Sequence, residues 1–216
     1  MHEEIDRLIG SVRREVGQAL RDGRPVRIAR AERDFDAEVA DLWDALTDPG
    51  RISCWLLPVS GDLRLGGRYQ LKGNASGIIT GCEPPRRLAV TWETLGEVSW
   101  VAVELSPAGE HCAHLALEHV ACVEPAHWKA FGPGAIGVGW DLALMGLARH
   151  LCAPTASVDP VTADGWAHTN EGREFMKKSA GAWGHAAIDA GEDRFMALAA
   201  AARTAQAYAG EESDAG

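Results

Sequence analysis

The stretch RLAVTWETLGEVSWVAVELSPAGEHCAHLALEHVA, residues 87–121, decides the fold of this 216-residue chain. It contains three short alternating runs, 87–93, 98–105 and 111–121, which are separated by turn-forming residues at 95–96 and 107–109. Connections this short join antiparallel neighbours, so the runs predict a β-meander. One parity of each run is apolar, which predicts a sheet with one face packed and one face toward water. The residues of that parity are Leu88, Val90, Trp92, Val101, Val103, Leu105, Leu115 and Leu117.

The same texture extends toward the N-terminus of this stretch. Further runs at 68–72 and 76–82 are bounded by glycine and proline pairs, and they add two strands to the meander. Upstream, Val26 and Ile28 alternate with arginines and predict a first strand. Two helices are expected between that strand and the meander. Asp36 is the expected cap of the first, and Asp48 with Pro49 begins the second, which ends near Trp55.

Helical periodicity marks both ends of the chain. Residues 3–22 place an apolar stripe at helical spacing and predict an N-terminal helix that stops at Gly23 and Pro25. After the glycine-rich stretch 132–139, whose glycines are expected to bend the backbone or let it pass close to a ligand, a long helix begins. Its inner stripe would cover the apolar face of the sheet. That stripe is Trp140, Leu144, Leu147 and Leu151. A linker at 153–165, two helices near 169–189 and 192–208, and an acidic, disordered tail complete the chain.

Several strings in this order resemble a known family. VADLWDALTDPGRISCWL, GGRYQL, GCEPPRRLAVTW and GWDLALMGLARHL resemble the activator of heat-shock-protein-90 ATPase homologue family, within the START-like SRPBCC superfamily. The resemblance covers about residues 25–153 and implies an α+β helix-grip fold, in which a curved antiparallel sheet wraps a long helix around a cavity. We therefore expect an N-terminal helix at 1–24, a grip domain at 25–153, a helical extension at 154–209 and a disordered tail at 210–216. The family has no fixed catalytic motif that could be carried over to this chain.

Composition excludes several classes of partner. The chain has 21 Lys and Arg against 31 Asp and Glu, and a net charge of −10 makes nucleic acid or an anionic membrane an unsuitable partner. No apolar run is long enough for a transmembrane helix, and the charged N-terminus does not resemble a signal peptide. Five cysteines without a CxxC pair predict free thiols in a reducing cytoplasm. We therefore expect a cytoplasmic protein, and a bacterial one.

The chain contains eight tryptophans, an unusually high number for its length. Trp92 lies on the apolar parity of its strand, Trp140 on the inner stripe of the long helix, and Trp55 near one mouth of the expected cavity. Such rings suit a pocket for a flat apolar ligand, and the alternative is that they fill the core. The predicted pocket residues are Trp55, Val90, Trp92, Val103, Leu117, His119, Trp140 and Leu144.

The run HCAHLALEH carries the densest set of chemically capable side chains. Period two places His119 on the apolar face, where it would orient a ligand, act as a general base tuned by burial, or form a hydrogen-bonded core residue. Cys112, His114 and Glu118 share the other face. Two of them at adjacent spacing fall short of the four ligands of a structural zinc site, so no metal is expected.

Non-covalent binding of a hydrophobic or aromatic small molecule in the helix–sheet cavity is therefore the expected function, without a cofactor or a catalytic residue. A co-chaperone-type module that contacts a chaperone or client protein is one alternative, and a polyketide cyclase-like enzyme is another. The N-terminal stripe and the faces of the C-terminal helices need a covering surface. A homodimer built from them is expected, with inward packing in a monomer as the alternative.

Overall fold

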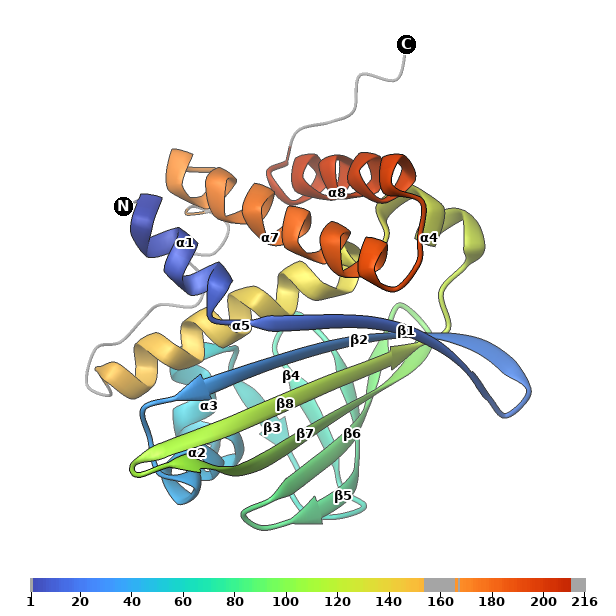
Figure 1. Ribbon diagram of the computed structural model, residues 1–216. Helices are drawn as coiled ribbons and strands as arrows, with labels where there is room; N and C mark the ends of the chain where they lie inside the picture. The colour runs from blue at the N-terminus through green and yellow to red at the C-terminus, as the bar shows by residue number, and fades with distance from the viewer. Residues whose placement is uncertain (1, 154–165, 167, 211–216) are drawn as a thin grey trace. The chain divides into compact units, whose positions relative to one another are not determined.

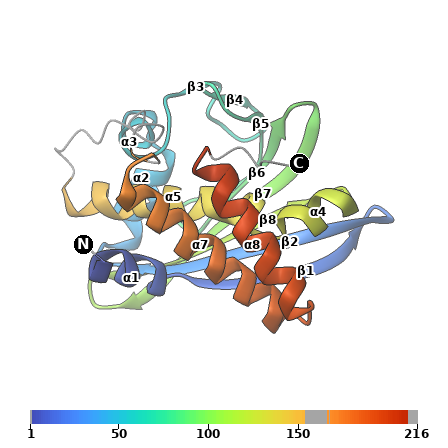
Figure 2. The ribbon, with the colours of Figure 1, turned by 90° about the horizontal axis from the view of Figure 1, so that it is seen from above.

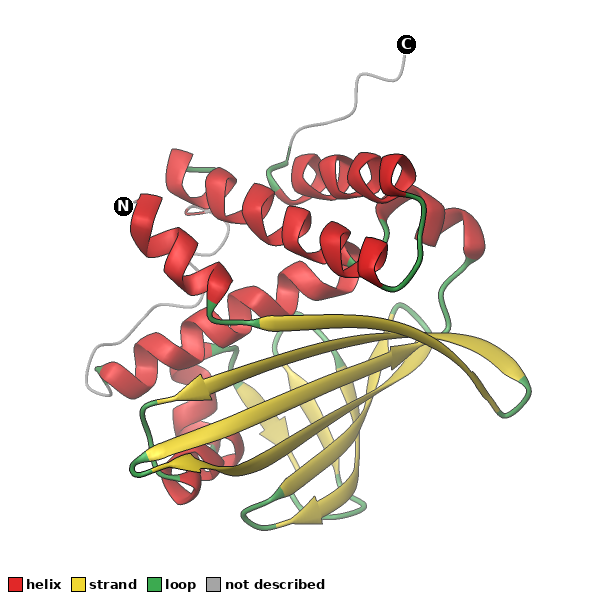
Figure 3. Ribbon diagram, in the orientation of Figure 1, coloured by secondary structure: helices red, strands yellow, loops and turns green. Residues whose placement is uncertain are grey.

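The computed structural model describes residues 2–153, 166 and 168–210, and its elements form an α+β fold around a curved antiparallel sheet (Figures 1 and 3). The sheet has eight strands in the spatial order β1-β2-β8-β7-β6-β5-β4-β3. They are β1 (Arg13–Arg21), β2 (Arg24–Phe35), β3 (Val59–Gly61), β4 (Arg68–Leu71), β5 (Ser76–Glu83), β6 (Arg87–Thr94), β7 (Glu97–Gly109) and β8 (Cys112–Ala121). The helices of the described residues are α1 (His2–Gly10), α2 (Val39–Thr47), α3 (Pro49–Trp55), α4 (Pro125–Phe131), α5 (Gly134–Cys152), α7 (Asn170–Asp189) and α8 (Arg194–Tyr208).

The chain divides into two compact units. The first, here called the helical unit, holds the described residues of 1–31, 123–142 and 161–216. The second, the sheet unit, holds residues 32–122 and the described residues of 143–160. Strand β2 and helix α5 each run from one unit into the other. The grip-domain boundaries at 25 and 153 stay a prediction, and the predicted linker and acidic tail lie almost wholly outside the described residues.

The meander predicted from residues 68–121 is confirmed. Strands β4 to β8 pair antiparallel with their sequence neighbours, and Val90 lies opposite Val101 while Val103 lies opposite Leu117. The burial of β8 alternates along its whole length, as expected for a strand with one packed face. Trp100 lies on the opposite parity, where it pairs with Thr91 and Val120.

The predicted helix over 3–22 is wrong in its second half. Helix α1 ends at Gly10, and residues 13–21 form strand β1, which pairs with β2 at one edge of the sheet. Asp22 and Gly23 join the two strands with positive φ angles of 52° and 75°. Two consecutive left-handed residues match the right-handed twist of a hairpin, and Asp-Gly is a strong signal for such a turn. Asp22 and Gly23 therefore end strand β1 and lead into β2, whereas the apolar spacing alone indicates the end of a helix at Gly23.

The two short helices occur where the sequence places them, with one difference at a cap. Asp48 caps α3, because its carboxylate accepts a hydrogen bond from the backbone N–H of Arg51 at 2.8 Å, and Pro49 takes the first helical position. The predicted cap of α2 is wrong. Glu38, rather than Asp36, stands at the N-cap position, and its side chain makes no capping hydrogen bond.

The glycine-rich stretch 132–139 is mostly helical, and the expected bend lies at its start, where Gly132 ends α4 with a positive φ of 60°. Helix α5 begins at Gly134, and its first turns provide close contacts inside the helical unit. A Cβ atom at Gly137 would lie 2.0 Å from the ring of Trp183 in α7, and one at Gly134 would lie 3.0 Å from Thr204 in α8. The glycines therefore allow two helices to approach the backbone of α5, and no ligand is needed to explain them.

Helix α7 is covered within one chain, whereas the predicted face of α8 is not. Helices α7 and α8 lie side by side, and α7 also contacts α1 and β1 (Figure 2). Phe175 is 1% exposed and Trp183 is fully buried. The fold therefore covers the rings of α7 within one chain, but it leaves the predicted face of α8 open, since Phe195 is 78% exposed and Ala202 is also exposed. The homodimer stays a prediction, which now rests on the exposed face of α8 and no longer on the rings of α7.

Within the described ranges, no single helix is both long and apolar enough to span a membrane. Helices α4 and α5 pass that test only as a pair, and they are bent by 59° at their junction.

Candidate functional site

The inner face of the sheet unit is the face that carries the apolar parity of the meander. On β8 this face is fully packed, since Leu115 and Leu117 are no more than 5% exposed, and on β7 Leu105 is buried as well while Val103 is half-buried. The second half of α5 belongs to the same unit and buries Leu144 and Leu147. The guanidinium of Arg33 in β2 donates to the carbonyl of Leu144 at 3.3 Å and so ties this half-helix to the sheet.

Toward β5 and β6 the same face is only partly covered. Tyr69, Leu71 and Ile79 form a buried cluster, and a layer of half-buried apolar side chains packs against it. That layer, here called the inner apolar surface, consists of Ile52, Leu56, Leu57, Val59, Cys82, Leu88, Val90 and Trp92. None of these side chains belongs to Asp, Glu, Lys, Arg or His. A partly exposed apolar layer of this kind is typical of a surface that binds an apolar partner.

A polar pair lies at the Trp92 end of this surface. His119 is 7% exposed, and its Nε2 lies 2.8 Å from Oγ of Ser99. The Ser99 hydroxyl donates to the backbone carbonyl of Trp92 at 3.0 Å, so it accepts from His119, and Nε2 carries the proton. The imidazole and indole rings are 6.4 Å apart between centroids. The pair thus presents polar atoms beside an aromatic wall.

Burial determines the charge of this histidine. Desolvation lowers the pKa of His119 to about 4, so the imidazole is neutral near pH 7. A base with so low a pKa is weak, and its Nε2 is already committed to Ser99. The arrangement matches the hydrogen-bonded core residue among the expected roles of His119, and it leaves a neutral group that can orient a ligand.

The other predicted pocket residues occupy different environments. Val90 and Trp92 lie on the inner apolar surface, and Val103 is half-buried next to it, opposite Leu88. Trp55 ends α3, where its indole N–H donates to the carbonyl of Ala45 at 2.9 Å. The buried side chains of Leu117 and Leu144 belong to the packed part of the core.

Trp140 is half-buried in the first half of α5, which belongs to the helical unit. The eight residues as one pocket therefore stay a prediction. Sequence reasoning did not single out Ile52, Leu56, Cys82 or Ser99. For Ser99 the available signal was its shared parity with Val101.

The helical unit contains a buried ionic cluster that no sequence pattern indicated. Asp141 is 2% exposed, and its Oδ2 accepts from Nε of Arg14 at 3.1 Å, from Ser179 at 2.5 Å and from the indole of Trp183 at 3.1 Å. Burial raises the pKa of Asp141, while Arg14, Ser179 and Trp183 act in the opposite direction. Arg14 also donates to the carbonyls of Ile9 and Val12. The cluster therefore links α1, β1, α5 and α7.

The outer face of β8 does not assemble a metal site. Nδ1 of His114 lies 2.7 Å from the carboxylate of Asp34, and its Nε2 lies 3.9 Å from Glu32. Over the residues described, no group of three or more His, Cys, Asp or Glu side chains is placed to hold a metal ion. The five cysteine thiols are all unbridged in the structure.

Comparison with known proteins identifies the family. Residues 36–151, just over half of the chain, match the family described as activator of Hsp90 ATPase homolog 1-like protein. The solution structure of CalU16 from Micromonospora echinospora is 33% identical over 84% of this chain and 97% of its own, with a TM-score of 0.67. Its crystal structure is 35% identical over 72% and 96%, with a TM-score of 0.58. MLL2253 from Mesorhizobium loti is 25% identical over 60% and 99%, with a TM-score of 0.52.

No protein of curated function matches the sequence. The family match and the similarity to CalU16 confirm the helix-grip, SRPBCC-type fold that the sequence motifs imply. The chain belongs to the activator of Hsp90 ATPase homolog 1-like family.

Proposed function

We propose that the protein binds a hydrophobic or aromatic small molecule, without chemical conversion, on the inner apolar surface of the sheet unit. The observation that carries this proposal is the half-buried state of that surface. Side chains such as Val90 and Leu88 lie on the packed parity of a sheet, yet they retain exposed area, whereas Leu115 and Leu117 on the same face do not. Covering such area with a ligand is favourable by about 25 cal/mol per Å².

The polar atoms near this surface limit the chemistry of the ligand. His119 and Ser99 are neutral and hydrogen-bonded to each other, so they favour an uncharged ligand whose polar tip exchanges a hydrogen bond with this pair. Trp92 offers an aromatic face beside them. A cyclase-type reaction would need polar groups that are free to act on the ligand, whereas His119 and Ser99 are hydrogen-bonded to each other and the side chains that define the surface are apolar.

Docking of a protein segment is the second candidate, because the family is described by its similarity to an activator of the Hsp90 ATPase. The same apolar surface would then hold side chains of a chaperone or client. Cytoplasmic location stays a prediction for either function. Native mass spectrometry separates the two, since a small molecule that copurifies with the chain supports the first and a bound protein supports the second.

A direct test uses N-phenyl-1-naphthylamine, a neutral apolar probe that fluoresces when it leaves water. The variant Val90→Asp places a carboxylate on the inner apolar surface and should weaken probe binding at least about tenfold, because burying an unpaired charge is costly. Val98→Asp is the matched control, since Val98 is an exposed residue of the neighbouring strand and pairs with Glu93 on the other parity.

A second variant protects the test against loss of folding. Val90→Thr keeps the branched shape of the side chain and replaces one methyl by a hydroxyl, so it should weaken the probe by a smaller factor. Because Val90 is half-buried, the hydroxyl can stay in contact with water, and the variant should melt closer to wild type than Val90→Asp does. Equal binding by wild type, Val90→Asp and Val98→Asp would contradict the proposal.

A further inference from the structure

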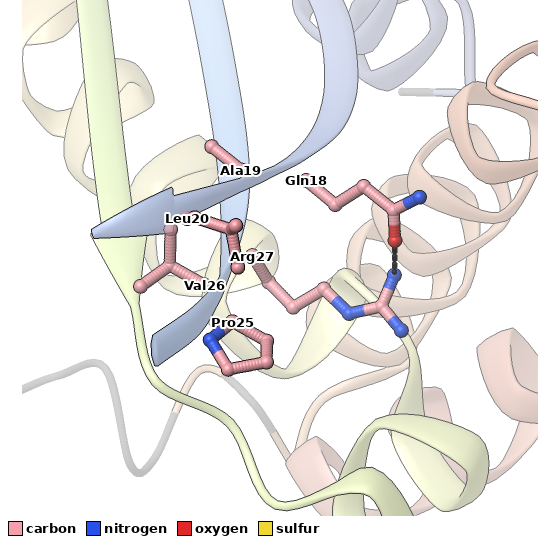
Figure 4. A pocket seen from close by; sticks show the side chains of 6 residues that line it. All are labelled: Gln18, Ala19, Leu20, Pro25, Val26 and Arg27. Atoms are coloured by element: carbon pink, nitrogen blue, oxygen red, sulfur yellow. Dashed lines mark hydrogen bonds between the residues drawn. The ribbon is translucent and has the colours of Figure 1, made fainter. Parts of the chain in front are cut away.

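One face of the β1–β2 hairpin carries a pocket of about 360 Å³ (Figure 4). Gln18 and Leu20 of β1 and Pro25 and Arg27 of β2 occupy alternate positions, so each pair shares a face of its strand. Ala19 and Val26 complete the lining. All six residues belong to the helical unit, so this pocket differs from the inner apolar surface of the sheet unit.

A fixed cation lies at this pocket. The guanidinium carbon of Arg27 is 4.6 Å from the ring centroid of Trp128 in α4, and an Nη1 N–H donates to Oε1 of Gln18 at 3.3 Å. The indole of Trp128 is itself held, because its N–H donates to Oε1 of Glu192 at 2.7 Å. Trp128 is 6% exposed, so it provides a rigid base for the planar guanidinium. Arg27 is thus positioned before any ligand arrives.

The guanidinium retains unused hydrogen-bonding capacity. It has five N–H donors, and within the described residues its hydrogen bond to Gln18 uses one of them. Glu192 is 3.9 Å from Nη1, beyond hydrogen-bond distance, and the Arg27 side chain keeps 33% of its surface exposed. A planar fork with unused donors at a pocket matches the two oxygens of a carboxylate.

The remaining lining selects the rest of the ligand. Leu20 is 75% exposed, and with Pro25 it offers an apolar wall at the pocket. A volume of about 360 Å³ suits a small molecule near the lower end of the range for ligand pockets. The charge of Arg27 is partly offset by the nearby carboxylate of Glu192, so this pocket would stabilise a doubly charged anion poorly. Single negative charge with an apolar body is therefore the matching chemistry.

We propose that the hairpin pocket binds a small amphiphilic carboxylate, with its carboxylate on Arg27 and its apolar body against Leu20 and Pro25. The site goes beyond the proposed function of the inner apolar surface, which favours an uncharged ligand. Its presence would give the protein two ligand sites of different polarity.

The test is a titration of the full chain with octanoate, followed by calorimetry and by the NMR signals of the Arg27 Nε–H and the Gln18 side-chain amide. Arg27→Gln should weaken octanoate binding at least about tenfold, since a hydrogen bond to a charged group is lost. Arg24→Gln is the matched control: it removes the same charge from an exposed position of the same strand outside the lining, so binding should stay within about twofold.

Glu192→Gln gives a change of opposite sign. It keeps an acceptor for the Trp128 indole and removes the competing negative charge, so octanoate should bind about threefold tighter or more. This gain cannot come from loss of folding. Val90→Asp should leave the calorimetric signal of octanoate unchanged, which separates this pocket from the inner apolar surface.

Two ligand controls complete the test. Octanol should bind at least about tenfold more weakly than octanoate, because it lacks the charge, and octyl phosphate should bind more weakly than octanoate. Equal affinity for octanol, tighter binding of octyl phosphate, unchanged affinity in Arg27→Gln, or no binding of octanoate near its solubility limit would each overturn the proposal.

Discussion

Gly137 and Gly181 offer the same substitution with opposite expected effects. Both lie inside helices, where replacing glycine by alanine in a permissive position stabilises a protein by about 0.5–1 kcal/mol through the unfolded chain. At Gly181 nothing lies within 4 Å of the new Cβ, so Gly181→Ala should gain that amount. At Gly137 the new Cβ would lie 2.0, 2.3 and 2.4 Å from three ring atoms of Trp183.

The cost at Gly137 follows from the position of that ring. Trp183 is fully buried, and its indole N–H donates to Asp141, so the ring cannot move aside without losing packing and a hydrogen bond. Overpacking of this kind costs about 1–3 kcal/mol, and displacement of the ring adds to it. After the helix gain is subtracted, Gly137→Ala should lose about 2 kcal/mol. For a chain of this length that lowers the melting temperature by about 4–8 °C.

Thermal and urea unfolding, followed by circular dichroism, measure both effects. In a Trp183→Leu background the ring is absent, so adding Gly137→Ala should cost little or gain stability, and the double-mutant cycle should show strong coupling. If Gly137→Ala melts at or above the wild-type temperature, or if the cycle shows no coupling, Trp183 does not pack on α5 as described.

Three further predictions concern buried or capping groups. The pKa of His119 is about 4 in the folded chain and 6.5 unfolded, so the unfolded state takes up the proton first. The contribution of His119 to the free energy of unfolding is fully present above pH 6.5 and falls by about 3 kcal/mol as the pH drops toward 4. His119→Gln should therefore flatten this part of a urea-denaturation pH series. Asp141→Asn leaves Arg14 buried without its ion-pair partner and should cost about 3–5 kcal/mol in urea unfolding, whereas Ser179→Ala should cost about 1 kcal/mol. Asp48→Ala removes the cap of α3 and should cost about 1 kcal/mol, with Asp62→Ala as an exposed control whose melting temperature should not change.

The inner face shows how far a sequence pattern reaches toward a site. Period two correctly placed Val90, Val103, Leu117 and His119 on one face, because alternation along a strand is a property of the backbone. The pattern could not distinguish Leu117, which is 5% exposed, from Val90, which is half-buried. The exposed fraction of each side chain depends on which helices or strands, distant in sequence, pack over it.

Local chemistry determined the meander, its turns, the capped helix α3 and the family motifs, because each depends on residues a few positions apart. Tertiary structure decided the rest. Val16 and Leu20 fit a helical stripe, yet they lie in β1, because pairing with β2 outweighs a weak local preference. The carboxylate of Asp141 meets Arg14 across 127 positions, and Trp183 fits over Gly137 from another helix. No local pattern encodes such contacts, since they form only when separate elements pack and exclude water.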